Sequence, residues 1–134
     1  MFTIMDYLKF YNNTSLDDVR WNTLDNLIGA ILVYLPIPSF NENKNLKELY
    51  NYVSSSTLVS SNFMATKAVE IFNIIKDSKR YDEIIISDFN NIKNDEVQFG
   101  ACVIKTKKEK IISFKGTDSS LIGWLENFRL AYEY

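Results

Sequence analysis

Apolar residues recur three and four positions apart through most of the first 83 residues of this 134-residue chain. Such spacing is typical of helices that bury one face. It predicts four helices, over Asp6–Tyr11, Trp21–Leu35, Leu46–Val53 and Phe63–Asp77. Ahead of the second helix, Thr14-Ser15 followed by Asp17-Asp18 fits a helix cap with acidic residues in its first turn.

Proline and serine mark the connections between these helices. Pro36 and Pro38 predict a rigid extended link, because each proline fixes its own backbone and biases the preceding residue away from helix. The serine-rich stretch Ser54–Ser61 is predicted to be the least ordered part, although it is too short and too apolar for a domain linker. Ser78-Lys79-Arg80-Tyr81 is expected to close the fourth helix.

The pattern then changes to short runs rich in β-branched residues. Ile84–Ile86 predicts one strand, bounded by a loop over Ser87–Asp95. Val97–Thr106 and Ile111–Lys115 predict two strands joined across Lys107–Lys110 as an antiparallel hairpin. Both strands are nearly continuous in apolar residues, which predicts burial on two faces of the sheet.

The last predicted element is an amphipathic helix over Leu121–Tyr132, whose apolar stripe contains Trp124 and Phe128. The elements together predict one domain over residues 1–134. Its first part, 1–83, is mainly helical, and its second part, 84–134, holds the strands and the terminal amphipathic helix. As it stands, this is an α+β arrangement.

Composition bounds the function. The chain is 46% hydrophobic and 14% aromatic, which suffices for a core. Its net charge of -2, without a long run of either sign, does not support nucleic-acid binding. The single cysteine, Cys102, lies in an apolar run and is expected to be buried. The most hydrophobic window, Leu24–Leu35, is too short to cross a membrane. Without a signal peptide or a disulfide framework, a cytoplasmic location is expected.

Four short segments carry a family resemblance. They are Asp25-Asn26-Leu27, Ser78-Lys79-Arg80-Tyr81, Gln98-Phe99-Gly100-Ala101, and Phe114-Lys115-Gly116-Thr117-Asp118 continuing to Gly123-Trp124. In this order they resemble the N-terminal portion of the bacterial Mbeg-like hydrolases, which are related to the class 3 lipases. The resemblance spans nearly the whole chain. It implies a truncated N-terminal part of an α/β-hydrolase, with a helical front, a β-hairpin and a terminal helix.

The resemblance assigns a role to Thr117. In such lipases the residue after the glycine of this motif supplies an oxyanion donor, here through the backbone N–H of Thr117 and its hydroxyl. Fixed donors at a strand end stabilise the negative charge of an acyl-transfer intermediate at little reorganisation cost. Two positions depart from the family pattern, because Lys115 stands where arginine is usual and Asn127 stands where aspartate is usual.

The residues alone also permit a purely structural interpretation of this segment. Thr117 can end a strand, and Asp118 or Ser119 can cap the helix that follows. Trp124 fits a packing position, and Glu126 with Arg129 fits an ordinary surface pair at helical spacing. The paired acids Asp17-Asp18 and Asp95-Glu96 fall in predicted turns and are expected to be solvated carboxylates.

The sequence excludes most catalytic chemistry for this chain alone. It contains no histidine, so no imidazole can accept a serine proton in a Ser-His-Asp triad. Its four glycines permit no Gly-x-Ser-x-Gly elbow, no dinucleotide-binding fingerprint and no P-loop. One cysteine and no histidine leave no zinc site, and the carboxylates lack calcium-loop spacing. No metal and no cofactor are therefore expected.

Three functional hypotheses follow. The first is an N-terminal fragment of a lipase or esterase-like serine hydrolase, inactive alone. The second is a non-catalytic protein-binding module that uses an exposed sheet edge, and the third is one half of a split hydrolase. Leu130–Tyr134 contains no glycine or proline stop, which favours an interruption. An incomplete sheet also predicts a homo-oligomer or a second polypeptide that covers it, with an acyl ester as substrate only in the completed enzyme.

Overall fold

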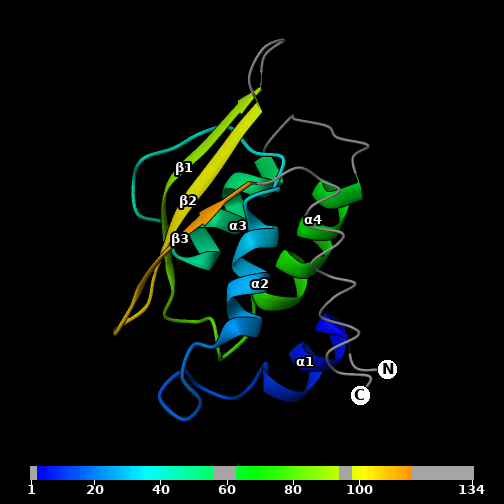
Figure 1. Ribbon diagram of the computed structural model, residues 1–134, viewed down its shortest axis with the longest axis vertical. Helices are drawn as coiled ribbons and strands as arrows, with labels where there is room; N and C mark the ends of the chain where they lie inside the picture. The colour runs from blue at the N-terminus through cyan, green and yellow to red at the C-terminus, as the bar shows by residue number, and fades with distance from the viewer. Residues whose placement is uncertain (1–2, 56–62, 94–97, 116–134) are drawn as a thin grey trace.

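The computed structural model describes residues 3–55, 63–93 and 98–115, in which helices precede strands along the chain (Figure 1). The helices are α1 (Ile4–Tyr11), α2 (Thr23–Leu32), α3 (Leu46–Ser55) and α4 (Phe63–Ile75). The strands are β1 (Ile85–Lys93), β2 (Gln98–Lys105) and β3 (Lys110–Phe114). The described part is thus α+β, as expected, with helices followed by an antiparallel sheet in the order β1-β2-β3. The predicted helix over 121–132 lies outside the described residues.

The helices begin where side chains cap them. Thr3 caps α1, and Asn22 caps α2 by accepting hydrogen bonds from the N–H groups of Leu24 and Asp25 at 2.8 and 3.3 Å. The predicted cap at Thr14-Ser15 is confirmed in part. The Oγ of Ser15 accepts from the N–H of Asp18 at 3.2 Å, but the turn that it caps is single and does not continue into α2.

The second helix is also shorter than predicted at its C-terminal end. It ends at Leu32, because the N–H groups of Tyr34 and Leu35 bond to carbonyl oxygens only three residues back. This tightening of the last turn leads the chain into the extended Pro36–Pro38 link. The other helices match their predicted positions to within about two residues.

The hairpin of β2 and β3 is confirmed, with Val103 paired to Ile112 at its centre. The predicted loop over Ser87–Asp95 is wrong, because β1 continues through it to Lys93. A bulge between Ser87 and Asn90 absorbs the change of register, and Asp88 there adopts a positive φ of 49°. Aspartate tolerates this left-handed conformation better than most residues.

Another segment of the same chain, around Phe40 and Lys44, pairs with the other edge of β1. Phe40 and Phe89 exchange backbone hydrogen bonds at 2.9 and 2.8 Å, and Lys44 does the same with Ile86. The rings of Phe40 and Phe89 stack with centroids 5.5 Å apart. The link after Pro38 therefore protects this edge of the sheet.

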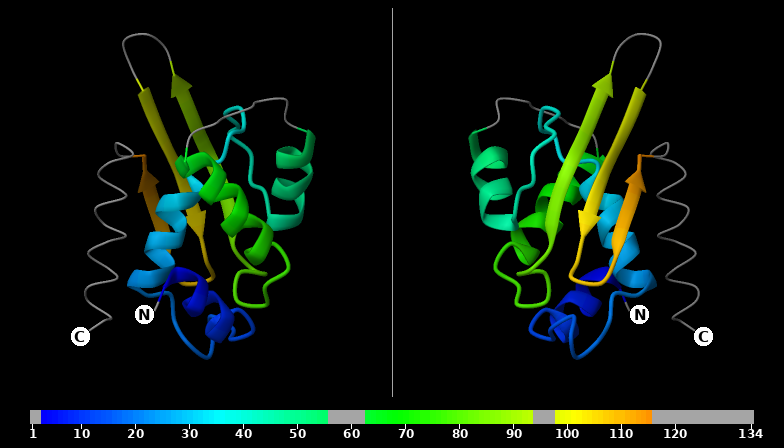
Figure 2. Two further views of the ribbon diagram at one scale, coloured as in Figure 1. Left: turned by 90° about the vertical axis from the view of Figure 1, so that its right-hand side faces the viewer. Right: turned by 90° about the vertical axis from the view of Figure 1, so that its left-hand side faces the viewer.

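The helix α2 lies against one face of the sheet and α4 packs against α2, while α3 lies beyond the β1 edge (Figures 1 and 2). Cys102 and Ile104 of β2 are buried beneath α2. On the opposite face, Ile112 is 58% exposed and Phe114 is 63% exposed. The predicted burial of both faces is therefore wrong for β3, because its alternate side chains point away from the helices.

Candidate functional site

Thr117, the predicted oxyanion position, lies outside the described residues, as do Asp118, Trp124 and Asn127. The strand that leads to it is described. β3 ends at Phe114, and the N–H of Lys115 then donates to the carbonyl oxygen of Gly100 at 2.7 Å. The Lys115 ammonium lies 5.0 Å from the centroid of the Tyr34 ring, just after α2. The residue before Gly116-Thr117 is thus held by both β2 and the end of α2.

Two glycines allow α2 to approach this part of the sheet closely. A Cβ at Gly29 would lie 2.8 Å from Cδ1 of Ile104 and 3.3 Å from Oγ of Ser113. A Cβ at Gly100 would lie 2.8 Å from Cβ of Lys115 and 3.2 Å from Cγ1 of Val33. These close approaches let α2 pack against β3 and let Lys115 lie directly beside Gly100.

Replacing Gly100 with valine should lower the free energy of unfolding by about 1–3 kcal/mol, because the added atoms overpack the contact between Lys115 and α2. Chemical denaturation of both proteins measures this difference. Val103→Ile adds one methylene on the outer face of the same strand and should stay within about 0.5 kcal/mol. Equal stability of Gly100→Val and the original chain would show that the close approach is not a constraint.

A buried polar cluster lies at the other end of α2. Arg80 is 1% exposed, and its Nε and one terminal nitrogen donate to the Asp25 carboxylate at 3.1 and 2.7 Å. Its other N–H groups donate to the backbone carbonyl oxygens of Thr14, Val19 and Arg20 at 3.2, 2.7 and 3.2 Å. All five guanidinium donors are therefore used. The Arg80 side chain thus connects the loop before α2 to the turn that follows α4.

Asp25 is fully buried and receives further donors. The hydroxyls of Tyr81 and Tyr7 donate to its Oδ1 at 2.6 and 3.1 Å, and the N–H of Asn22 donates to its Oδ2 at 2.9 Å. The single charge of Arg80 balances that of Asp25, and both carboxylate oxygens are hydrogen-bonded. A buried charge is tolerated when it is paired with an opposite charge and fully hydrogen-bonded, and Asp25 and Arg80 meet both requirements.

The cluster shifts the ionisation of its members. Burial, together with the nearby charge of Asp25, raises the pKa of Tyr7 to about 12 and raises the pKa of Tyr81 well above its usual value. Burial opposes the charge of Arg80, but hydrogen bonds and attraction to Asp25 outweigh this effect and raise its pKa. The two tyrosines thus remain protonated donors and Arg80 remains charged at neutral pH, a pattern that suits structural support better than proton transfer.

The described residues of the four segments that carry the resemblance come together at two places. Asp25 contacts Arg80 and Tyr81 at the start of α2, and Gly100 contacts Lys115 near its end. The Mbeg1-like family model matches residues 75–134. No curated protein and no solved structure gives a significant match.

The Mbeg1-like segment begins at the last residue of α4 and includes the whole sheet. It contains Arg80, Tyr81, Gly100 and Lys115, whereas Asp25 lies outside it. Sequence reasoning did not assign a role to the Asp25–Arg80 pair. The available signal was one aspartate in the apolar window Leu24–Leu35 and one arginine in the turn that closes α4, two opposite charges with apolar neighbours.

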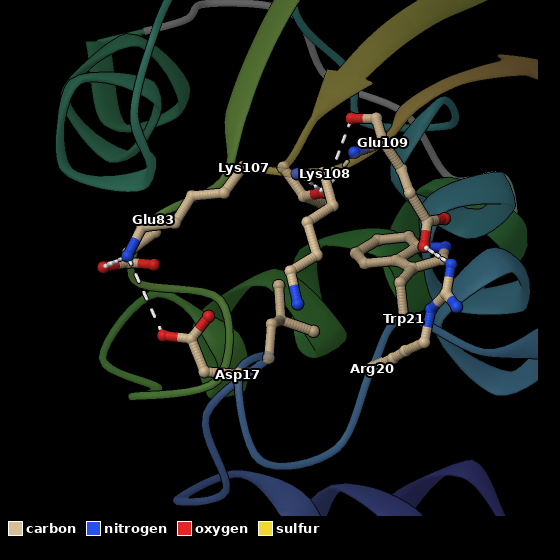
Figure 3. Close-up of a pocket in the computed structure, with 9 residues that line it drawn as sticks. Asp17, Arg20, Trp21, Glu83, Lys107, Lys108 and Glu109 are labelled. Atoms are coloured by element: carbon tan, nitrogen blue, oxygen red, sulfur yellow. Dashed lines mark hydrogen bonds and ion pairs between the residues drawn. The ribbon is translucent and has the colours of Figure 1, made fainter.

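A shallow hollow lies where the β2–β3 turn faces the loop before α2 (Figure 3). Lys107 reaches Glu83 at 3.0 Å and Asp17 at 3.8 Å, and Arg20 reaches Glu109 at 3.2 Å. These partly exposed ion pairs hold three loops together, each with a small contribution to stability. The expectation that Asp17 is a loop carboxylate is confirmed, since it is exposed and pairs with the surface residue Lys107.

The remaining candidate groups are structural. Cys102 is buried, and burial raises the pKa of its thiol to about 12, so that little thiolate forms at neutral pH. Within residues 3–55, 63–93 and 98–115, no cluster of acidic or thiol side chains has the arrangement of a metal site. No helix among these residues has the length and apolar character needed to cross a membrane.

Proposed function

We propose that this chain supplies the front part of a lipase-like serine hydrolase and is inactive alone. In this proposal the Gly116-Thr117 turn provides an oxyanion donor, while the nucleophile, acid and histidine belong to polypeptide outside these 134 residues. The proposal depends on one observation about β3, the strand that directly precedes Gly116-Thr117 in the sequence. This strand is hydrogen-bonded to β2 and packs against α2. It belongs to the segment that the Mbeg1-like model matches. The link from that family to lipases rests on the resemblance of the four segments.

The proposal assigns a supporting role to the described contacts. An oxyanion donor stabilises an intermediate only if its N–H is fixed before the charge develops. The backbone hydrogen bond of Lys115 to Gly100 and the packing of α2 against β3 fix the strand immediately before the proposed donor. The buried Arg80–Asp25 cluster holds the start of the same helix. Acyl esters are the substrate class of the completed enzyme.

We expect the purified chain to show no turnover of short or long p-nitrophenyl esters, because it contains no histidine to activate a serine. Release of p-nitrophenol after repeated purification is the measurement. Turnover that persists at constant specific activity, and that disappears when one of the serines of this chain is replaced, would contradict the proposal.

Complementation tests the positive half of the proposal. A second polypeptide that carries a Gly-x-Ser-x-Gly elbow, an acid and a histidine, encoded next to this chain, should restore ester hydrolysis on co-expression. In that complex Thr117→Pro removes the backbone donor and should lower kcat by about 10²–10³. Thr117→Val keeps the N–H and removes the hydroxyl, so its kcat measures the contribution of the hydroxyl alone. Equal rates for Thr117→Pro and the original complex would argue against an oxyanion role.

A second candidate function is a protein-binding module. The observation that favours it is that Ile112 and Phe114 are exposed on β3, which is an edge strand of the sheet formed by the described residues. Edge strands with apolar side chains are sites of strand addition. Unrelated genes on both sides of this one would favour the binding module, whereas an adjacent elbow motif would favour the fragment or split enzyme.

A further inference from the structure

The backbone of β3 presents a defined pattern at the edge of the sheet. The N–H of Lys115 bonds to Gly100, and the N–H of Thr106 bonds to the carbonyl oxygen of Glu109. In an antiparallel ladder, directly opposed residues alternate between hydrogen-bonded and non-hydrogen-bonded pairs. Ile111 and Ser113 therefore direct their backbone groups toward β2, and the residues between them direct theirs away from it.

The outward set consists of Lys110, Ile112 and Phe114. Within the described residues, β3 has β2 on one side and no strand on the other. The side chains of all three are exposed as well, on the face of the sheet opposite α2. Backbone donors and acceptors thus coincide with an apolar surface strip. This combination requires a partner strand more than it requires a small ligand.

We propose that β3 pairs with β3 of a second copy of this chain, antiparallel and centred on Ile112. This register places Ile112 opposite Ile112 of the second copy and Lys110 opposite Phe114 of the second copy. Each of these pairs is of the hydrogen-bonded type and exchanges two backbone hydrogen bonds. The two sheets become one continuous sheet.

Charge disfavours two alternatives to this register. A pairing centred on Lys110 would oppose two lysines, and a parallel pairing would align Lys110 with its own copy, which is unfavourable. In the register centred on Ile112, Glu109 of one copy comes opposite Lys115 of the other, so that opposite charges meet at both ends of the strand pair. Each lysine at position 110 faces an aromatic ring. This complementarity indicates a second copy as the occupant of the edge.

Sedimentation velocity of the full chain over a micromolar concentration series tests the proposal, with dimer as the expected species. Ile112→Lys places two like charges at the centre and should weaken association about tenfold or more. Ile112→Pro removes an N–H that points away from β2, so the β2–β3 hairpin is retained while pairing between copies is lost. Phe63→Lys, at a 61% exposed position of α4, is the matched control and should remain dimeric.

The outcomes separate cleanly. A dimer for the original chain and for Phe63→Lys, with monomers for both Ile112 variants that retain their circular dichroism, supports the pairing. A monomeric original chain overturns it and leaves the edge to a different polypeptide. Dimers that persist in both Ile112 variants overturn it too, as does equal dissociation of the Phe63→Lys control. None of these results depends on ester hydrolysis.

Discussion

Replacing Arg80 with alanine should lower the free energy of unfolding by about 3–5 kcal/mol, the range for removing one partner of a buried ion pair. The cost is large because Asp25 would remain charged and fully buried. The backbone carbonyl oxygens of Thr14, Val19 and Arg20 would also lose their donor. Urea denaturation followed by circular dichroism is the measurement. For a domain of this size such a loss is comparable with a large part of the total stability.

Two controls make the interpretation specific. Arg80→Lys keeps the charge but offers three donors on one nitrogen in place of five in a planar fork, so it should recover only part of the loss. Arg20→Ala removes an exposed arginine that pairs with Glu109 at the surface and should cost less than about 1 kcal/mol. A loss of less than about 1 kcal/mol for Arg80→Ala as well would show that the cluster contributes little to stability.

Alkaline pH should destabilise the chain through Tyr7 and Tyr81. Both are buried, and their folded pKa values are raised above the ordinary value near 10, to about 12 for Tyr7. Their contribution to stability is complete below about pH 10 and is lost as pH rises through the folded pKa values, because the unfolded chain releases these protons first. Between its unfolded and its folded pKa, each tyrosine should lower the free energy of unfolding by about 1.4 kcal/mol per pH unit.

The measurement is the free energy of unfolding at successive pH values, with phenolate absorbance recorded in parallel. Tyr7→Phe and Tyr81→Phe should each reduce the slope, since each removes one of the two shifted hydroxyls. Tyr50→Phe, at an exposed position, should leave the slope unchanged. A slope that none of the variants alters would assign the alkaline loss to other groups.

The spacing of apolar residues predicted those elements whose form depends mainly on residues close together in sequence. The helical spacing located α3 and α4 closely, and the apolar runs located the β2–β3 hairpin. The errors arose where distant residues decide the outcome. β1 extends through a polar stretch because residues around Phe40 and Lys44 pair with it, at more than forty positions' separation in sequence. The start of α2 was predicted two residues early, at Trp21, because no capping role was assigned to Asn22, which caps the helix through its side chain.

The candidate site was predictable only as a resemblance. The four segments pointed to relevant positions, but no pattern indicated that Asp25 and Arg80 form a pair, because the two lie 55 residues apart in sequence. The exposed face of β3 was missed for a related reason. A continuous apolar run predicts burial on both faces only when a second layer is present, and within the described residues helices lie against one face.

The five hydrogen bonds of Arg80 also bear on where a folding unit can be cut. The family match starts at residue 75, yet every acceptor of the Arg80 side chain belongs to residues 14–25. Expressed from residue 75 onward, the matched segment would retain the guanidinium and lose all of its acceptors, together with the helix that packs on Gly100. The boundary of sequence similarity is therefore not a boundary of autonomous folding, and expression vectors for this region should retain the helices from α1 onward.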